Sequence, residues 1–591
     1  MAPPGVVYLS QRLPRVCAPP ALIYLLYLLA KDFWAINLPN SLVLATIILS
    51  PPLALALSVE WTIRRDQRAA ATLGAVIPPQ VPHRWPGSVD ILLKSLNNFK
   101  DGYPGDNMEP WINKLGHMFN VRVLFENRIF TTEPEHIKAI LATDFSNFEK
   151  GPVFRFQMES VLGMGVFNAD VDMWRFHRSM TRPFFSKERI SHFDNFDRHA
   201  EDAIQQMKAR FRSGHAIDFQ DLISRFTLDS ATEFLFGHDV QSLSAGLPYP
   251  QGSSTTPIGQ AEEHPADRFA RSFSEAQTAM AKRSRYGLAW PLLEFWVDTA
   301  KSHLGPINAF VEPILKDAVE KKRRDGELGL KPVNGQLEDT LLDHLVNYTQ
   351  DQRILKDEIL NMLVAGRDTT AGTLTFVIYL LSQHPRVLFR LRQEILAVVG
   401  SHTRPTHENL REMKYLRAVI NETLRLFPIV PFNVRTSIGA TTWPSKRADG
   451  KPYYIPARTR CPYSVFLMHR RTDLWGPDAL EFDPDRFIDE RLHKYLTPNP
   501  FIFLPFNAGP RICLGQQFAY NEISFMIVRL FQNFSSVSLD PDAQPSSSKP
   551  PPSWTNGSGR KSIEKIRPRT HLTMYALEGL WLKMDEGTEV E

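Results

Sequence analysis

The sequence predicts a mainly α-helical protein with small β-sheets, preceded by an N-terminal membrane anchor. Two observations predict this class: segments with helical apolar spacing dominate residues 87–591, and the first 77 residues contain two apolar runs. A chain of 591 residues has room for roughly two to four average domains. Because it contains no internal repeat, we interpret 87–591 as one large domain.

The anchor is expected within residues 1–77, where the apolar runs are 21–30 and 41–61. A membrane-spanning helix needs about 20 mostly apolar residues, so the second run qualifies, although Pro51-Pro52 should kink it. The first run is shorter and fits a second span, a re-entrant arm or an interfacial helix. The alternative is a soluble protein with an apolar N-terminal helix. Positive charge follows the second run, at Arg64, Arg65 and Arg68.

These arginines predict that the rest of the chain stays in the cytosol, by the positive-inside rule. Residues 78–86 contain four prolines, which predicts a stiff spacer between the anchor and the large domain. A formal net charge of +4 is too small to indicate a nucleic-acid partner. Three scattered cysteines, Cys17, Cys461 and Cys513, form no disulfide framework and favour a reducing compartment.

Within the large domain, alternation over 121–131 predicts a hairpin, and 572–584 is expected to be a strand. Segments 242–265 and 540–569 are rich in Ser, Gly and Pro, so we expect surface insertions there. Four helices are expected, over 356–383, over 385–399 with Gly400 at its end, over 410–427 and over 514–531.

A cysteine loop lies before the last of these helices, in Phe506–Gly515. Cys513 at a helix N-terminus would have its thiolate stabilised, and thiolate is the form that binds a metal. Gly509 and Gly515 would let the backbone pass close to a flat porphyrin. Arg511 would bind a haem propionate while the sulfur faces the iron. For an isolated motif, the simpler interpretation is a buried free cysteine.

Residues 365–370, Ala-Gly-Arg-Asp-Thr-Thr, interrupt the apolar face of the first long helix. Glycine is unfavourable in a helix, and a threonine hydroxyl can take up a backbone carbonyl and open the helix locally. Over a haem, such a defect would admit dioxygen and water. Asp368 and Thr369 would then deliver the protons that O–O cleavage requires. A helix kink with a solvent-facing Asp368 is an equal alternative.

Glu422 and Arg425 lie three residues apart on one helix face. Pairs of this kind are mostly surface ion pairs, but this helix is apolar, and Arg486 follows in Pro484–Phe487 before the cysteine. We therefore expect a structural triad that braces the cysteine loop.

Further cations would accompany Arg511 around two buried propionates. The candidates are Trp174 and Arg178, four apart on a basic helix, and Arg435. Taken singly, each of these residues is better explained as ordinary surface polarity.

Together these motifs resemble the cytochrome P450 family of haem-thiolate monooxygenases, from about Val81 to the C-terminus. The resemblance implies a mainly α cytochrome P450 fold for 87–591 and haem b as cofactor. Cys513 would be the axial iron ligand, and Asp368 and Thr369 would deliver protons. The propionates would be held by Trp174, Arg178, Arg435 and Arg511.

The segments around Ala365, Pro428 and Cys513 resemble, more narrowly, the fungal P450s that hydroxylate alkanes and fatty acids. This implies C–H hydroxylation of such substrates by O2, at the endoplasmic reticulum membrane with the catalytic domain in the cytosol. Electrons would come from NADPH through a separate cytochrome P450 reductase, with cytochrome b5 as an optional second donor. A basic surface would dock that partner, with contributions from Arg175, Arg182 and Lys187.

Candidate substrate contacts lie on the long helix and after the third helix. They are Leu363, Val364, Ile429, Val430, Phe432 and the 154–167 loop, although several would also serve as core packing. Oxidation of aromatic xenobiotics, including polycyclic hydrocarbons, and terpenoid tailoring are alternatives within the family. A redox-independent isomerase or dehydratase, against which Asp368-Thr369 argues, and a haem sensor are further alternatives.

Overall fold

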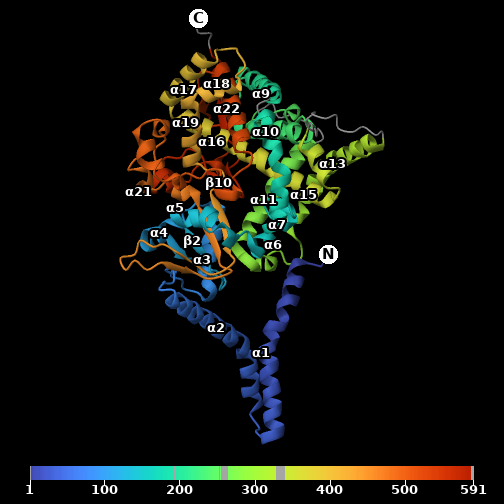
Figure 1. Ribbon diagram of the computed structural model, residues 1–591, viewed down its shortest axis with the longest axis vertical. Helices are drawn as coiled ribbons and strands as arrows, with labels where there is room; N and C mark the ends of the chain where they lie inside the picture. The colour runs from blue at the N-terminus through green and yellow to red at the C-terminus, as the bar shows by residue number, and fades with distance from the viewer. Residues whose placement is uncertain (1, 191–192, 252, 254–263, 328–339, 588–591) are drawn as a thin grey trace.

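The computed structural model describes residues 2–190, 193–251, 253, 264–327 and 340–587. A mainly helical body stands on a hairpin of two long N-terminal helices (Figure 1). The helices are α1 (Pro4–Trp34), α2 (Asn40–Thr72), α3 (Val89–Asp101), α4 (Glu109–Leu115), α5 (Pro134–Lys138), α6 (Gly151–Leu162), α7 (Val171–Thr181), α8 (Lys187–Ile190), α9 (Asp194–Arg212), α10 (Phe219–Phe236), α11 (Pro265–Tyr286), α12 (Thr299–Ser302), α13 (Leu304–Glu327), α14 (Leu341–Tyr348), α15 (Gln352–Leu363), α16 (Thr369–Gln383), α17 (Pro385–Val398), α18 (His407–Glu412), α19 (Lys414–Leu426), α20 (Val465–Met468), α21 (Thr472–Trp475) and α22 (Gln516–Asn533).

Small sheets complete the body, and the largest has the strand order β1-β2-β8-β5-β3. The β1–β2 pair is antiparallel, which confirms the predicted hairpin near 121–131. The other sheets are β10-β11, β4-β12-β9 and β6-β7. The strands are β1 (Met118–Asn120), β2 (Ile129–Thr131), β3 (Phe148–Glu149), β4 (Ile217–Asp218), β5 (Phe432–Ser437), β6 (Thr441–Trp443), β7 (Tyr453–Ile455), β8 (Arg460–Ser464), β9 (Ser538–Leu539), β10 (Pro568–Thr570), β11 (Met574–Ala576) and β12 (Trp581–Lys583).

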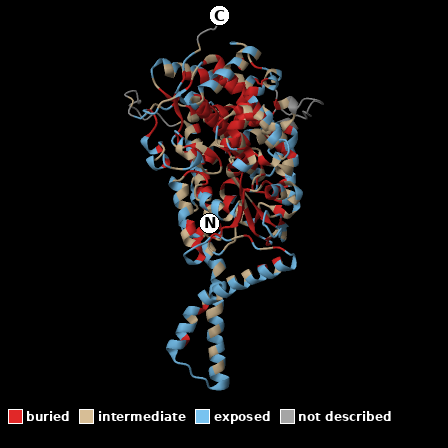
Figure 2. Cartoon of the chain, turned by 90° about the vertical axis from the view of Figure 1, so that its left-hand side faces the viewer, coloured by how far each residue is buried: buried red, intermediate tan, exposed pale blue. Residues whose placement is uncertain are grey.

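The core lies around α16, which contacts α10, α19 and α22. Residues 370–381 of α16 are all buried, as the red interior of Figure 2 shows for the centre of the body. A helix that is apolar on every face is stable only when other elements cover it completely. This requirement places α16 at the centre of the domain.

The helix expected over 356–383 is present, with the predicted opening in its middle. Residues Val364–Asp368 form one π-helical turn between α15 and α16. The Thr369 Oγ1 hydroxyl donates to the Ala365 carbonyl at 2.6 Å, which is the bond expected of threonine at such a defect. Turns of this kind widen a helix locally and are frequent at functional sites.

Two expected elements were wrong in extent. The helix expected over 410–427 is divided at Met413, because Thr406 and Asn409 cap a separate short helix, α18, with a capping box. The single strand expected over 572–584 is two strands, β11 and β12, in different sheets. A turn with left-handed backbone at Glu578 and Gly579 separates them.

The segment expected as a surface insertion over 540–569 also contributes to the interior. Trp554 and Glu564 are buried. The Glu564 carboxylate accepts from the Tyr379 hydroxyl at 2.5 Å and pairs with Arg560 at 3.1 Å. The segment is therefore tied to α16. The other expected insertion, 242–265, lies partly outside the described residues.

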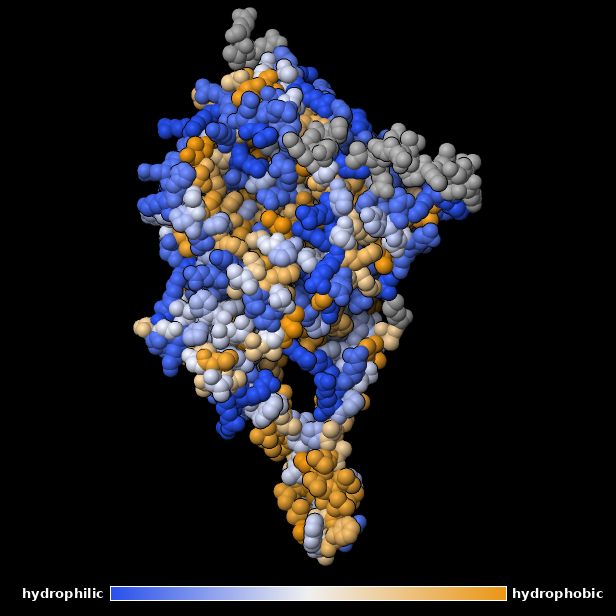
Figure 3. All heavy atoms as spheres, viewed as in Figure 1, coloured by the Kyte–Doolittle hydropathy of each residue, from blue (hydrophilic) through white to orange (hydrophobic). Residues whose placement is uncertain are grey.

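Helices α1 and α2 are both long and apolar enough to cross a membrane, with windows of mean hydropathy 1.5 and 2.2. They pack against each other, and hydrophobic residues gather on this hairpin in Figure 3. Both helices extend beyond the expected runs, 21–30 and 41–61. Helix α2 includes Pro51 and Pro52 as one continuous helix.

Candidate active site

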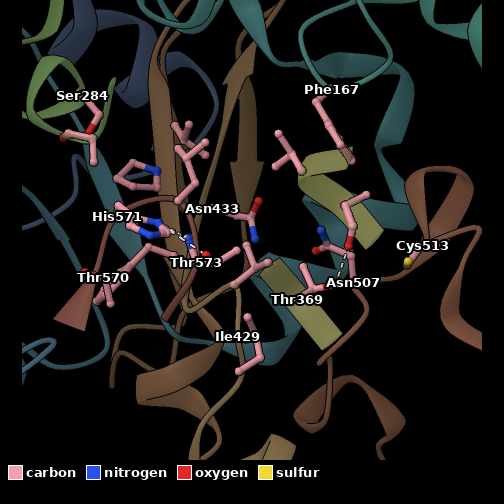
Figure 4. A pocket seen from close by; sticks show the side chains of 18 of the residues that line it. Phe167, Ser284, Thr369, Ile429, Asn433, Asn507, Cys513, Thr570, His571 and Thr573 are labelled. Atoms are coloured by element: carbon pink, nitrogen blue, oxygen red, sulfur yellow. Dashed lines mark hydrogen bonds between the residues drawn. The ribbon is translucent and has the colours of Figure 1, made fainter. Parts of the chain in front are cut away.

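A cavity of about 580 Å³ lies in the middle of the body. Segments that are far apart in the sequence form its walls: the cysteine loop, the π-helical turn, α11, β5 and the β10–β11 region. In Figure 4, Cys513 lies at one side, Ser284, Thr570 and His571 lie at the other, and Thr369 lies between them. One cavity therefore joins the candidate metal ligand to a distant group of polar residues.

Two hydrogen bonds hold the Cys513 loop in place. The Cys513 N–H donates to the Phe506 carbonyl at 3.0 Å, and the Asn507 side chain accepts from the Tyr463 hydroxyl at 2.9 Å. The sulfur faces the cavity (Figure 4). Burial raises the pKa of the Cys513 thiol, while the Gly515 N–H and the Arg178 charge act in the opposite direction. A cationic metal in the cavity would supply the positive charge that stabilises a thiolate there.

Gly509 has a specific packing role. Its φ is +67°, and a Cβ at this position would lie 1.8 Å from the Leu141 carbonyl oxygen. Gly515 differs, because a Cβ there would meet Phe185 at an ordinary 3.6 Å. The constraint at Gly509 is therefore the close approach to the backbone around Leu141.

Cationic side chains gather at the Cys513 end of the cavity. Arg178, Arg435 and Arg511 line it together with Trp174, as the sequence led us to expect, and Lys150 joins them. The Arg511 guanidinium lies over the Trp174 ring at 4.6 Å and pairs with Asp170 at 2.9 Å. Sequence analysis missed Lys150, because an isolated lysine before a helix belongs to no motif.

This group has more positive charge than its neighbours neutralise. The Arg511 Nε is buried without a hydrogen-bond partner among the described residues. Burial and then Arg435 lower the pKa of Arg511 to about 10, and burial, Arg435 and Arg511 hold the pKa of Lys150 well below its usual value. Buried cations of this kind need anionic partners. The residues present therefore fit the two propionates of a haem whose iron Cys513 would bind.

The two expected proton-delivery residues lie on different sides of the cavity wall. Thr369 lines the cavity, but Asp368 does not. The Asp368 carboxylate accepts from the Gln277 amide at 2.6 Å and from Arg367 at 3.0 Å. On the cavity side, burial lowers the pKa of His571 to about 4, against the attraction of Asp368. His571 is therefore neutral at pH 7, and sequence analysis did not identify it.

Four of the five expected substrate contacts line the cavity: Val364, Ile429, Val430 and Phe432. Leu363 is a correction, because it is fully buried in the core and does not reach the cavity. It is the last residue of α15, before the π-helical turn that brings Val364 to the cavity wall. The 154–167 segment also lines the cavity, through residues that include Phe154 and Phe167, but its first part is helix α6.

Glu422 lies between two arginines in the interior. Its two oxygens accept from Arg425 at 2.7 Å, and Arg486 Nε approaches Oε1 at 3.4 Å. All three side chains are fully buried. Arg425 also donates to the His469 carbonyl at 2.8 Å, and the His469 ring accepts from the Leu504 N–H at 2.9 Å. This chain of bonds connects α19 to the start of the cysteine loop.

Substitution Glu422→Ala should produce a protein that binds haem poorly. The change leaves two buried arginines without their carboxylate, and breaking a buried ion pair typically costs about 3–5 kcal/mol. Haem content per polypeptide and the carbon monoxide difference spectrum measure the effect. Glu412→Ala, on the exposed surface of α18, is the matched control. Normal haem content in Glu422→Ala would contradict a bracing role.

Comparison with known proteins gives one consistent family. A family model described as Cytochrome P450 matches residues 79–563. The Fusarium sp protein named Cytochrome P450 monooxygenase g430 is 36% identical over 494 residues, which cover 81% of this chain and 83% of that protein. Cytochrome P450 52E1 of Candida apicola is 36% identical over 484 residues, covering 79% and 87% of the two chains.

Cytochrome P450 52A3-A of Candida maltosa is 34% identical over 475 residues, which cover 78% of this chain and 85% of that protein. The family match spans the cysteine loop, the π-helical turn and the Glu422 network together. The chain therefore belongs to the cytochrome P450 family and is an oxygen-incorporating oxidoreductase, with a haem-thiolate cofactor and a hydrophobic substrate.

Proposed function

We propose that this enzyme hydroxylates C–H bonds of long aliphatic chains, n-alkanes or fatty acids, by inserting one oxygen atom from O2. The observation that carries the proposal is the single cavity joining Cys513 to apolar walls. Those walls include Met158, Leu235, Val364 and Ile429. An apolar stretch of cavity wall beside Cys513 suits ligands that are recognised by burial of hydrocarbon.

The bound cofactor is proposed to be haem b, with Cys513 as axial ligand. Trp174, Arg178, Arg435 and Arg511, with Lys150 as an addition from the structure, would hold its propionates. Such a haem activates dioxygen, and the thiolate supports O–O cleavage. The protein positions the substrate chain, excludes bulk water and supplies protons.

Proton delivery is proposed to use Asp368 and Thr369. The Thr369 hydroxyl faces the cavity while it donates to Ala365. Asp368 is held outside by Arg367 and Gln277. The Asp368 carboxylate would pass a proton to the cavity by breaking its contact with Arg367 or Gln277 and turning toward the cavity. The π-helical turn leaves room for this movement because the helix is locally open there.

Electrons are proposed to come from NADPH through a separate reductase, with cytochrome b5 as an optional second donor. Arg175 and Arg182 are exposed. Burial and then the charge of Arg182 lower the pKa of Arg178, and the charge of Arg178 acts against the burial that raises the pKa of Cys513. These charges therefore lie on the side of the body nearest the thiolate, where an acidic partner would dock. The side chain of Lys187, the third expected contributor, lies outside the described residues.

The enzyme is proposed to sit in the endoplasmic reticulum membrane with the body in the cytosol, anchored by residues 1–77. The α1–α2 hairpin favours two passes, because the Gly5 N–H donates to the Phe295 carbonyl of the body at 2.9 Å. Both outer ends of the hairpin therefore lie on the body side, where Arg64 and Arg65 follow the second apolar run.

An epitope tag placed before α1 should be digested by protease added to intact microsomes, together with the body. A two-pass hairpin exposes both on the cytosolic side. Tags recovered intact would indicate a single pass, and release of the protein by alkaline carbonate would indicate no spanning helix. A mobility shift after endoglycosidase treatment would show glycosylation at Asn347, Asn421, Asn533 or Asn556. It would contradict the cytosolic orientation of the body.

Thr369→Ala should uncouple the reaction. Product per NADPH should fall at least about tenfold, since a positioned proton donor typically contributes 10²-fold or more and cavity water replaces part of it. NADPH oxidation should continue with increased hydrogen peroxide. Thr375→Ala is the matched control, because Thr375 lies on the same helix, makes the same type of bond to Ala371 at 2.8 Å and does not line the cavity. Unchanged coupling in Thr369→Ala would exclude the relay.

The substrate assignment is tested by expressing the chain with a fungal reductase in yeast microsomes. A mixture of lauric acid, hexadecane and phenanthrene is supplied with NADPH, and products are identified by mass spectrometry. Terminal hydroxylation of the aliphatic chains is expected. Oxidation of phenanthrene with the chains untouched would replace the proposal with a wide-pocket oxidase of aromatic compounds.

A further inference from the structure

The cavity has a second group of cations at the end away from Cys513. Its members are Arg128, Arg285, Arg460 and Arg569. Arg285 lies on α11 and Arg569 on β10. Their chain neighbours Ser284 and Thr570 are on the opposite side of the cavity from Cys513 in Figure 4. Thr369 and Ile429 lie between Cys513 and the end with Ser284 and Thr570 in Figure 4.

Two of these four arginines have a carboxylate partner. Arg128 pairs with Glu126 at 3.1 Å, and Arg460 approaches the other oxygen of Glu126 at 3.6 Å. Arg128 also donates to the Arg285 carbonyl at 3.0 Å. Arg128 and Arg460 therefore have a structural role, because their contacts hold the β1–β2 turn against the end of α11.

The other two arginines, Arg285 and Arg569, have no carboxylate within 4.0 Å among the described residues. Arg285 donates to the Ala281 carbonyl of its own helix at 2.5 Å and lies over the Phe99 ring at 3.8 Å. Arg569 Nη1 is buried without a hydrogen-bond partner. The nearby Asp101 approaches Arg567 instead, at 3.8 Å.

The positive charge of Arg569 also affects the pKa of Arg285. Burial and then the charge of Arg569 lower the pKa of Arg285 to about 10, so both remain charged at pH 7. Two half-buried like charges without a carboxylate partner are unfavourable until an anion binds between them. Guanidinium groups bind carboxylates through paired, charge-assisted hydrogen bonds. Asn98, Ser284 and Thr570 line the same end and offer further polar contacts.

We propose that Arg285 and Arg569 bind the carboxylate of a long-chain fatty acid, whose methyl end then points along the apolar wall toward Cys513. The inference rests on the proposed function and narrows it to a substrate class. It makes the enzyme prefer acids over alkanes of equal length. It also directs oxidation to the end of the chain farthest from the carboxylate.

Spectral binding titrations of the holoenzyme with dodecanoate, methyl dodecanoate and dodecane test this. The ester has the same chain but no charge. Wild-type enzyme should bind dodecanoate at least about tenfold more tightly than the ester, as loss of a charged hydrogen bond typically costs that much. In Arg285→Gln and Arg569→Gln the ratio of the two Kd values should approach one. Arg285→Lys and Arg569→Lys should retain part of the preference.

Lys282→Gln is the matched control, since Lys282 is an exposed cation on α11 outside the cavity, and it should leave the ratio unchanged. A ratio that stays constant in both glutamine variants would overturn the inference, as would equal losses for acid and ester. Wild-type enzyme that binds acid and ester equally would overturn the inference and leave the proposed function standing. Failure of every aliphatic ligand to bind or be oxidised would refute the proposed function itself.

Discussion

The position of one sulfur atom depends on a buried ion network. Glu422 is held between Arg425 and Arg486, all fully buried, and Arg425 reaches the backbone that supports His469 and then Leu504. Burying these charges is favourable only because each has its partners. The network therefore stabilises one arrangement of the chain before Cys513. The place of Cys513 in the cavity wall depends on that arrangement.

Positively charged side chains lie at two ends of the cavity. Lys150, Arg435 and Arg511 lie near the sulfur, and Arg285 and Arg569 lie at the other end, with apolar wall between. Within a protein, a charge can be balanced by another side chain or by a ligand. At the sulfur end the unbalanced charge matches the haem propionates. At the far end it matches a chain with one anionic terminus, so the same principle underlies the proposed binding of cofactor and substrate.

Much of this architecture could be predicted from the sequence, where a feature depends on neighbours in the chain. Thr369 opens its own helix by bonding to Ala365, four residues earlier, and the Glu422–Arg425 pair needs only helical spacing. The prediction failed where packing between distant segments decided the position of a residue. Leu363 has the same apolar character as Val364, but the π-helical turn directs only Val364 to the cavity. The expected strand over 572–584 is divided because its halves pair with different strands.

The sequence by itself determined the family, the candidate thiolate ligand and the apolar N-terminal helices, because each depends on contiguous residues with a local physical signature. Only the tertiary structure decided which charges remain unpaired. Lys150, Arg285 and Arg569 belong to no motif, and they line one cavity because α11, β10 and the segment before α6 meet there. The burial of each side chain and its distance to the nearest counter-charge depend on how these segments pack together, and the roles proposed for these residues rest on both.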